Sequence, residues 1–225
     1  VLSFQKMNAI LDIDPANLTA VVQPGVVIGA LNAAVAPHGL ISPPDPGTVA
    51  TATMGGAAAE NSGGLRGLKS GVTKHYIMGM EVVLANGDVY RTGMGSVKGD
   101  KAWQVFKWGY GPTLDGMFTQ SNYGICTKMG FWLMPKPPVF KPLEIQFDED
   151  SDISEIVEFI RPLRIAQVIP NSVVIAGVLL GWLDYDTGTA MAGSTLWCKF
   201  FFDFALWIVN RFIRIGIGIN TANLI

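Results

Sequence analysis

Short apolar runs separated by polar turns dominate the beginning of the chain. Residues 9–13 and 18–22 are two such runs, divided by an Asp-Pro-Ala-Asn turn at residues 14–17, and they predict a pair of short strands. Residues 26–37 are rich in alanine and repeat their larger apolar side chains at helical spacing, with Gly39 as a stop signal. We therefore expect a strand pair followed by a helix.

The alternation of strands and turns continues in the middle of the chain. Residues 80–84 and 89–92 flank Asn86-Gly87, a dipeptide that favours a type I′ turn, and are expected to form a β-hairpin. Residues 124–134 predict a further strand, which ends at the proline cluster of residues 135–138. Strands with helices on one side predict an α+β fold rather than a doubly wound sheet.

The sequence after the prolines repeats this pattern with more apolar residues. Residues 143–147 and 172–178 predict strands, and residues 153–163 have helical periodicity. Two segments, residues 165–183 and 196–219, are strongly apolar, but polar residues or proline interrupt the first and charged residues the second. Neither is a clean membrane span. We expect buried strands in the first segment and no well-specified structure in the second.

Composition and charge narrow the functional classes. Apolar residues make up 49% of the 225 residues and the mean hydropathy is +0.35, which is ample material for a core. The net charge of −2 argues against a nucleic-acid partner, which usually requires a basic face. Cys126 and Cys198 lie far apart, so neither a disulfide framework nor a metal site is expected. A cytoplasmic location is favoured, with peripheral membrane association as an alternative.

Residues 44–71, which we call the glycine-rich segment, have an unusual composition. Glycine stands at positions 47, 55, 56, 63, 64, 67 and 71, and most of the other side chains are small. Such a segment gains little from burial, whereas glycine permits positive φ and lets a ligand touch the backbone. Its N–H and hydroxyl groups suit the oxygens of a phosphate-containing cofactor. A tightly turned loop without a ligand is the structural alternative, and the spacing matches neither a Rossmann nor a Walker motif.

The order of short motifs in this region resembles that of a known family. The motifs are PPDPG at residues 43–47, ATMGG at 52–56, AENSGG at 59–64 and KSGVT at 69–73. They resemble the flavin site of the vanillyl-alcohol oxidase/p-cresol methylhydroxylase-type FAD flavoproteins. Within that superfamily, residues 20–95 are most similar to glycolate oxidase D-subunits and D-lactate dehydrogenases.

The following stretch resembles a different branch of the same superfamily. WGYGP at residues 108–112, DGMFTQSNYGI at 115–125 and WLMP at 132–135 are typical of the 4-alkylphenol oxidases, among them vanillyl-alcohol oxidase and eugenol hydroxylase. This second resemblance covers residues 98–175. The tyrosine-rich element usual in that branch is missing from residues 62–71, so the chain is a mosaic whose substrate is open.

The resemblance implies a domain organisation. Residues 1–135 are expected to be an FAD-binding domain of the p-cresol methylhydroxylase type that lacks its N-terminal pyrophosphate-loop part. Residues 136–190 would begin an α+β substrate domain, and residues 191–225 form an unassigned hydrophobic tail.

The resemblance also implies FAD as the cofactor and a set of residues that contact it. Asp45 and His75 are the catalytic candidates, one as a carboxylate near the flavin ring and the other as a base. Their structural alternatives are a turn aspartate between two prolines and a structural histidine. The expected cofactor-binding residues are Pro44, Asp45, Pro46, Thr53, Met54, Gly55, Gly56, Asn61, Ser62, Gly63, Gly64, Gly71, Gly124 and Ile125.

The implied activity for the complete protein is that of an FAD-linked oxidase or dehydrogenase. The first expectation is hydride transfer from a 2-hydroxy acid such as glycolate or D-lactate to flavin N5, with oxygen, a quinone or a cytochrome as electron acceptor. One alternative is oxidation of a 4-alkylphenol such as vanillyl alcohol or eugenol. Another is a truncated, inactive chain. The expected partners are the small-molecule substrate and the electron acceptor, and homo-oligomerisation is left open.

Overall fold

The computed structural model describes most of the chain. The described residues are 3–109, 111–139, 141–147, 153–176, 182–183, 190–191 and 196–202. They divide into two compact units, Val1–Lys136 and Pro137–Ile225, which are described separately. Both contain helices and strands, so the expected α+β class is confirmed.

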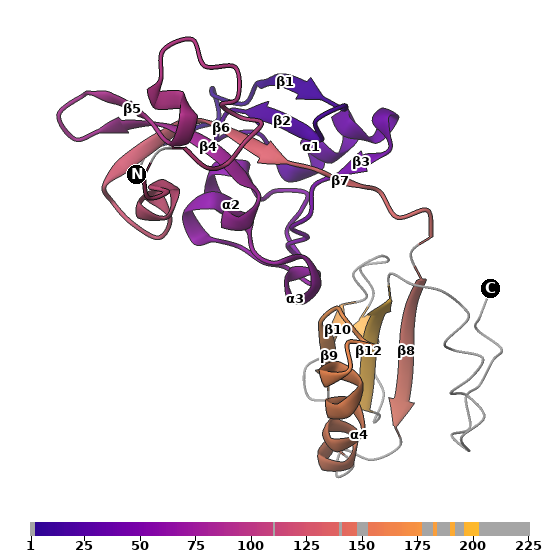
Figure 1. The fold of residues 1–225 in the computed structure, drawn as a ribbon. Helices are drawn as coiled ribbons and strands as arrows, with labels where there is room; N and C mark the ends of the chain where they lie inside the picture. The colour runs from indigo at the N-terminus through magenta and orange to yellow at the C-terminus, as the bar shows by residue number, and fades with distance from the viewer. Residues whose placement is uncertain are drawn as a thin grey trace. The chain divides into compact units, whose positions relative to one another are not determined.

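A five-stranded antiparallel sheet organises the first unit (Figure 1). The predicted strand pair is confirmed, because β1 and β2 are joined through the polar turn, where Asp14 Oδ1 accepts hydrogen bonds from the Ala16 and Asn17 N–H groups at 3.0 Å. In order across the sheet, the strands are β1 (Ile10–Asp14), β2 (Thr19–Val22), β6 (Gly124–Trp132), β4 (Ile77–Leu84) and β5 (Val89–Arg91).

The predicted hairpin between β4 and β5 is present, but its turn is not of type I′. That type requires positive φ at both central residues. Gly87 has φ 88°, whereas Asn86 is not among the residues with positive φ. The Gly87 N–H instead donates to Leu84 O at 2.9 Å, and the Asn86 side chain bonds Asp88 at 2.7 Å. A four-residue loop closed by local hydrogen bonds therefore replaces the expected two-residue turn.

Helices and short turns cover the sheet and carry the glycine-rich segment. The predicted helix is α1 (Ile28–Val35), which continues as η1 (Ala36–His38) and ends at Gly39 with φ 68°. Ile28, Leu31 and Val35 of α1 are buried in the core with Met80 and Phe131 of the sheet. The remaining short elements are β3 (Leu40–Ile41), paired with β7 (Met134–Pro135), then α2 (Met54–Glu60), α3 (Gly67–Ser70), η2 (Thr73–His75), η3 (Gly93–Ser96) and η4 (Asp115–Phe118).

The second unit contains a three-stranded antiparallel sheet and one helix. The sheet has the order β8 (Lys141–Phe147), β12 (Leu196–Phe202) and β9 (Val173–Ala176). Helix α4 (Ile153–Ile165) confirms the predicted helix, and β10 (Trp182–Leu183) pairs with β11 (Ala190–Met191).

Of two further sequence expectations for this second unit, one is confirmed within the described residues and one is wrong. The strand predicted at residues 172–178 is described only as far as Ala176, so its end lies outside the described residues. Residues 196–202 form β12, although we expected no well-specified structure there. Strand β12 lies between two antiparallel neighbours, β8 and β9, and forms its hydrogen bonds with them. These partners come from other parts of the sequence, so the residues of β12 alone did not predict the strand. No helix among the described residues is long and apolar enough to cross a membrane.

Candidate functional site

Two stretches of the glycine-rich segment run side by side at Asp45 and Gly64. These two residues form a parallel β-bridge, and the Leu65 N–H donates to Asp45 O at 3.1 Å. Gly64 has φ 71°, and a Cβ at this position would lie 2.0 Å from Asp45 O. Both the backbone conformation and the close approach require glycine. Pro44, Asp45 and Gly64, three of the expected cofactor-binding residues, thereby lie together.

Helix α2 packs its first turn against the loop before α1. Thr53 caps the helix, since its Oγ1 accepts a hydrogen bond from the Gly56 N–H at 3.1 Å. The Gly55 N–H donates to Pro24 O at 2.8 Å, and a Cβ on Gly55 would lie 2.5 Å from Pro24 Cβ. Met54 is 1% exposed. Gly55 and Met54 therefore have packing reasons within the chain, whereas Gly56 is exposed.

The end of α2 is tied to η2. Asn61 adopts φ 53°, and its Oδ1 accepts a hydrogen bond from the Lys74 N–H at 3.0 Å. Ser62 O accepts from the hydroxyl and the N–H of buried Thr73, at 2.6 and 2.9 Å. Gly63 lies between these contacts, where a Cβ would be 3.2 Å from Val72 Cγ1. Asn61, Ser62 and Gly63 thus lie in one closed turn.

His75 is exposed and hydrogen-bonded to the backbone. Its Nδ1 accepts from the Val72 N–H at 3.2 Å, and a Cβ on Gly71, which has φ 84°, would lie 2.4 Å from the same nitrogen. A neutral imidazole that accepts at Nδ1 carries its proton on Nε2 and has no second basic nitrogen. This contact favours the structural alternative for His75 over a role as general base.

Arg66 belongs to the candidate site by its contact with Asp45, and it is not among the residues expected from the sequence. It is 8% exposed, and its guanidinium lies 3.3 Å from the Asp45 carboxylate, while its Nε has no hydrogen-bond partner in the described part of the chain. Buried arginines are rare unless they are paired. The signal available in the sequence was that Arg66 is the single arginine among residues 44–71.

Gly124 and Ile125 lie away from the other predicted residues along the sheet. Gly124 pairs with Leu84 and Ile125 with Val83, at the far end of β4 from Ile77, which follows η2. At roughly 3.3 Å per residue, β4 spans about 23 Å from Ile77 to Leu84. A Cβ on Gly124 would lie 2.3 Å from Val82 Cγ1, so this glycine has a packing reason as well.

The polar groups around the glycine-rich segment fit FAD. Ser42 Oγ and Arg66 Nε are buried without a partner in the described residues, one on each side of Pro44 and Asp45 in sequence. Hydroxyl, guanidinium and backbone N–H groups are donors, and the phosphates, hydroxyls and ring carbonyls of FAD are acceptors. Exposed Gly56 and Gly64 leave backbone accessible to such a ligand.

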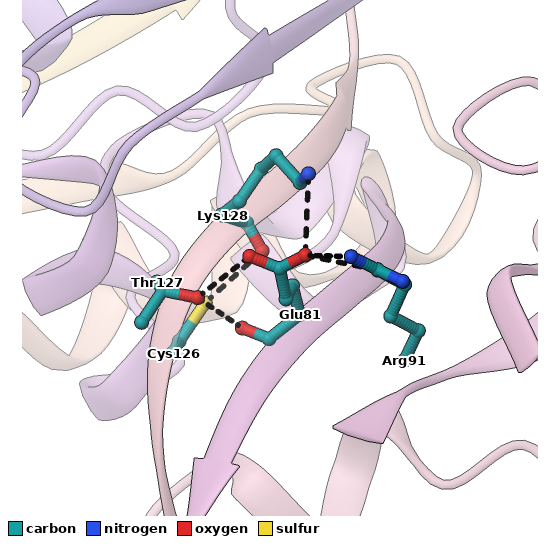
Figure 2. A network of polar contacts seen from close by, with 5 residues as sticks. All are labelled: Glu81, Arg91, Cys126, Thr127 and Lys128. Atoms are coloured by element: carbon teal, nitrogen blue, oxygen red, sulfur yellow. Dashed lines mark hydrogen bonds and ion pairs between the residues drawn. The ribbon is translucent and has the colours of Figure 1, made fainter. Parts of the chain in front are cut away.

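A second polar cluster lies on β4, β5 and β6 (Figure 2). The Glu81 carboxylate contacts Arg91 at 2.8 Å, Lys128 at 3.3 Å and the Thr127 hydroxyl at 3.0 Å. Burial raises the pKa of Glu81, but the hydrogen bonds from Arg91 and Thr127 and the charge of Lys128 outweigh it and lower the pKa. We call Glu81, Arg91, Thr127 and Lys128 the Glu81 network. Its single carboxylate is paired with both cations, Arg91 and Lys128, which indicates a structural role.

Cys126 lies beside the Glu81 network and offers no nucleophile. Burial raises the pKa of its thiol to about 12, and the thiol donates to Lys128 O at 3.4 Å. A thiol with this pKa stays protonated at neutral pH and is inert.

Comparison with known proteins identifies the type of domain. The family model described as "FAD binding domain" matches residues 1–93. The 4-cresol dehydrogenase [hydroxylating] flavoprotein subunit of Pseudomonas putida is 54% identical over 184 residues, which are 80% of this chain and 34% of that protein. This chain carries an FAD-binding domain of the p-cresol methylhydroxylase type.

Two further similarities agree with an FAD-binding domain of this type. The glycolate oxidase subunit GlcD of Bacillus subtilis is 44% identical over 170 residues, which are 76% of this chain and 34% of that protein. A crystal structure of p-cresol methylhydroxylase with substrate bound superimposes with a TM-score of 0.70 at 45% identity, covering 88% of this chain and 42% of that one. FAD is the cofactor that these relatives imply, and the chain spans about a third of the length of the curated relatives it matches.

Proposed function

We propose that this chain supplies the FAD-binding part of an oxidoreductase that acts on a 4-alkylphenol such as 4-cresol. The observation that carries the proposal is the higher identity to the 4-cresol dehydrogenase subunit, 54%, than to the glycolate oxidase subunit, 44%. Our first expectation from the sequence was a 2-hydroxy acid. The comparisons favour the alkylphenol alternative instead.

In this proposal the glycine-rich segment holds the cofactor against its backbone. FAD, when bound, supplies the acceptor for a hydride from the substrate. Pro44, Asp45, Gly63 and Gly64 would present backbone and small side chains to it, and the Asp45–Gly64 bridge would keep the two passes of the segment in register. Asp45 would act mainly by position, because its carboxylate is already engaged by Arg66.

The charges of the described residues support a neutral substrate. A 2-hydroxy acid carries a carboxylate, which enzymes often clamp with the two parallel N–H groups of an arginine. Each arginine in the described part of the chain already has a partner, so none is left for such a clamp. Arg66 contacts Asp45, Arg91 contacts Glu81, Arg161 contacts Glu158 at 2.8 Å, and Arg164 donates to the carbonyls of Ile169 and Asn171.

A flavin-bleaching experiment tests the proposal. The purified chain is titrated with FAD, freed of excess cofactor and mixed without oxygen with 4-cresol, glycolate or D-lactate, while the visible flavin absorbance is recorded. We expect FAD to bind and 4-cresol alone to bleach it. Bleaching by a 2-hydroxy acid but not by 4-cresol would overturn the proposed substrate class. Bound FAD that no substrate bleaches, or no FAD uptake, would favour the inactive alternative.

A further inference from the structure

Gln120 connects two parts of the first unit that are distant in sequence. It lies between η4 and β6, and its backbone N–H donates to Ala59 O at 2.7 Å. Its side-chain Nε2 donates to Glu60 O at 3.3 Å across a sequence separation of 60 residues. Both acceptors are in the last turn of α2, so a single residue binds the end of this helix twice.

These bonds complete the C-terminal cap of α2. The last carbonyls of a helix have no partner within it. The carbonyls of Ala57 and Ala58 accept from the N–H of Asn61, and that of Ala57 also accepts from Ser62. Ala59 and Glu60 depend on Gln120, which adopts φ 51° to reach them. A non-glycine residue in this left-handed conformation is uncommon and costs free energy.

The segment that carries Gln120 is anchored at both of its ends. Asp115 is 5% exposed and accepts a hydrogen bond from the Thr92 hydroxyl, next to the end of β5. The Ser121 hydroxyl donates back to Met117 O. The chain then enters β6 at Gly124, where a side chain would collide with Val82 Cγ1. Gln120 therefore links the segment of residues 115–125 to the glycine-rich segment.

We propose that Gln120 is a positioning residue that joins the two parts of the cofactor site and makes it selective for a dinucleotide. One part is the glycine-rich segment, and the other is the start of β6 with Gly124 and Ile125. FAD has two separate aromatic ends, whereas FMN and riboflavin have one, so only FAD gains from a fixed distance between the two parts. The inference rests on the proposed binding of FAD.

The test compares FAD with FMN in variants at this position. In Gln120→Gly the side chain is lost while glycine adopts φ 51° without strain; in Gln120→Ala the strain remains. Gln23→Ala is the matched control, because Gln23 Oε1 accepts a comparable hydrogen bond from the Ala9 N–H at 3.0 Å, outside the site. Affinities for both flavins are measured by fluorescence quenching, and apoprotein stability by thermal unfolding.

We expect the ratio of FAD to FMN affinity to fall about tenfold in both Gln120 variants, the change that loss of roughly one hydrogen bond produces, and to stay unchanged in the control. Gln120→Asn should restore part of the affinity ratio, because asparagine tolerates the left-handed conformation and keeps an amide. This variant replaces the other two in the test if they unfold. An unchanged ratio, or an equal loss of both affinities together with apoprotein stability, would overturn the inference. Failure of the unmodified chain to bind FAD would instead refute the proposed cofactor site.

Discussion

The glycine-rich segment and the Glu81 network hold neighbouring stretches of chain together by opposite means. At Asp45 and Gly64 two backbone passes touch directly, with no side chain between them. At Glu81 three strands are joined by side chains, in which one carboxylate contacts two cations and a hydroxyl (Figure 2).

This difference separates a region suited to a ligand from one that is complete by itself. Around the glycine-rich segment, buried donors of Ser42 and Arg66 have no partner in the described residues. The Glu81 carboxylate, in contrast, bonds on both of its oxygens. Unsatisfied buried donors cost about 1–3 kcal/mol each, and a ligand that accepts from them recovers that free energy. We therefore expect substitutions in the first region to change FAD affinity and those in the second to change stability alone.

Gly64→Ala should have the largest effect. The new Cβ would lie 2.0 Å from Asp45 O in a backbone conformation with φ 71°, so the two passes must separate. We expect a loss of about 3–5 kcal/mol in the free energy of unfolding, measured by urea denaturation, and loss of FAD binding.

Gly67→Ala is the matched control for this substitution. Gly67 begins α3 and has nothing within 4 Å of its Cβ position, so alanine should be neutral or stabilise by about 0.5–1 kcal/mol. Equal effects of the two substitutions would contradict the role assigned to the Asp45–Gly64 contact.

Arg66→Met should have an intermediate effect and sharpen the contrast between the regions. It removes the ion pair with Asp45 and the buried guanidinium while keeping most of the apolar stem. Because the Asp45 side chain is 34% exposed, water takes over part of its solvation, and we expect a loss of about 1–3 kcal/mol in unfolding free energy.

The Arg66 variant should also bind FAD at least tenfold more weakly by fluorescence titration, and Arg66→Lys should recover part of this affinity because it keeps the charge. If Arg66→Met lowers stability without changing FAD affinity, the arginine is a structural residue and the contrast with the Glu81 network fails.

The strands, the first helix and the flavin-type motifs could be predicted because they depend on local signals. A short apolar run placed β2, the proline cluster marked the end of the strand that contains β6, and helical spacing placed α1. The turn after Leu84 was predicted with the wrong type, because Asn86 bonds Asp88 and leaves only Gly87 with positive φ. The dipeptide alone cannot reveal that competing side-chain bond.

The contacts that assemble the candidate site could not be predicted, because they join residues far apart in sequence. Glycine at position 64 is explained by Asp45, and glycine at position 124 by Val82. Gln120 lies in the motif at residues 115–125 without a role that the motif reveals, and Arg66 lies in no motif. The bonding of Gln120 and the burial of Arg66 appear only in the folded chain. The sequence therefore indicated that the segment binds a cofactor, while the structure shows that several of its glycines serve chain packing.

Glu81→Gln should have the smallest effect, and its pH dependence distinguishes it from the others. The pKa of Glu81 is lowered in the folded chain, so its contribution is present above the usual glutamate value near 4.5 and is lost as the pH falls through the folded value. Arg91 is half exposed, which screens its attraction, and we expect a loss of about 1 kcal/mol at pH 7.

Urea denaturation at pH 7 and pH 3 checks this expectation. The difference between the unmodified chain and Glu81→Gln should shrink at the lower pH, because glutamine is a neutral isostere of the protonated glutamate. FAD affinity at pH 7 should stay unchanged, since every partner of Glu81 belongs to the three strands rather than to the glycine-rich segment. A pH-independent difference would show that packing, not charge, holds the strands here, and weakened FAD binding would show that the two regions are coupled through β4.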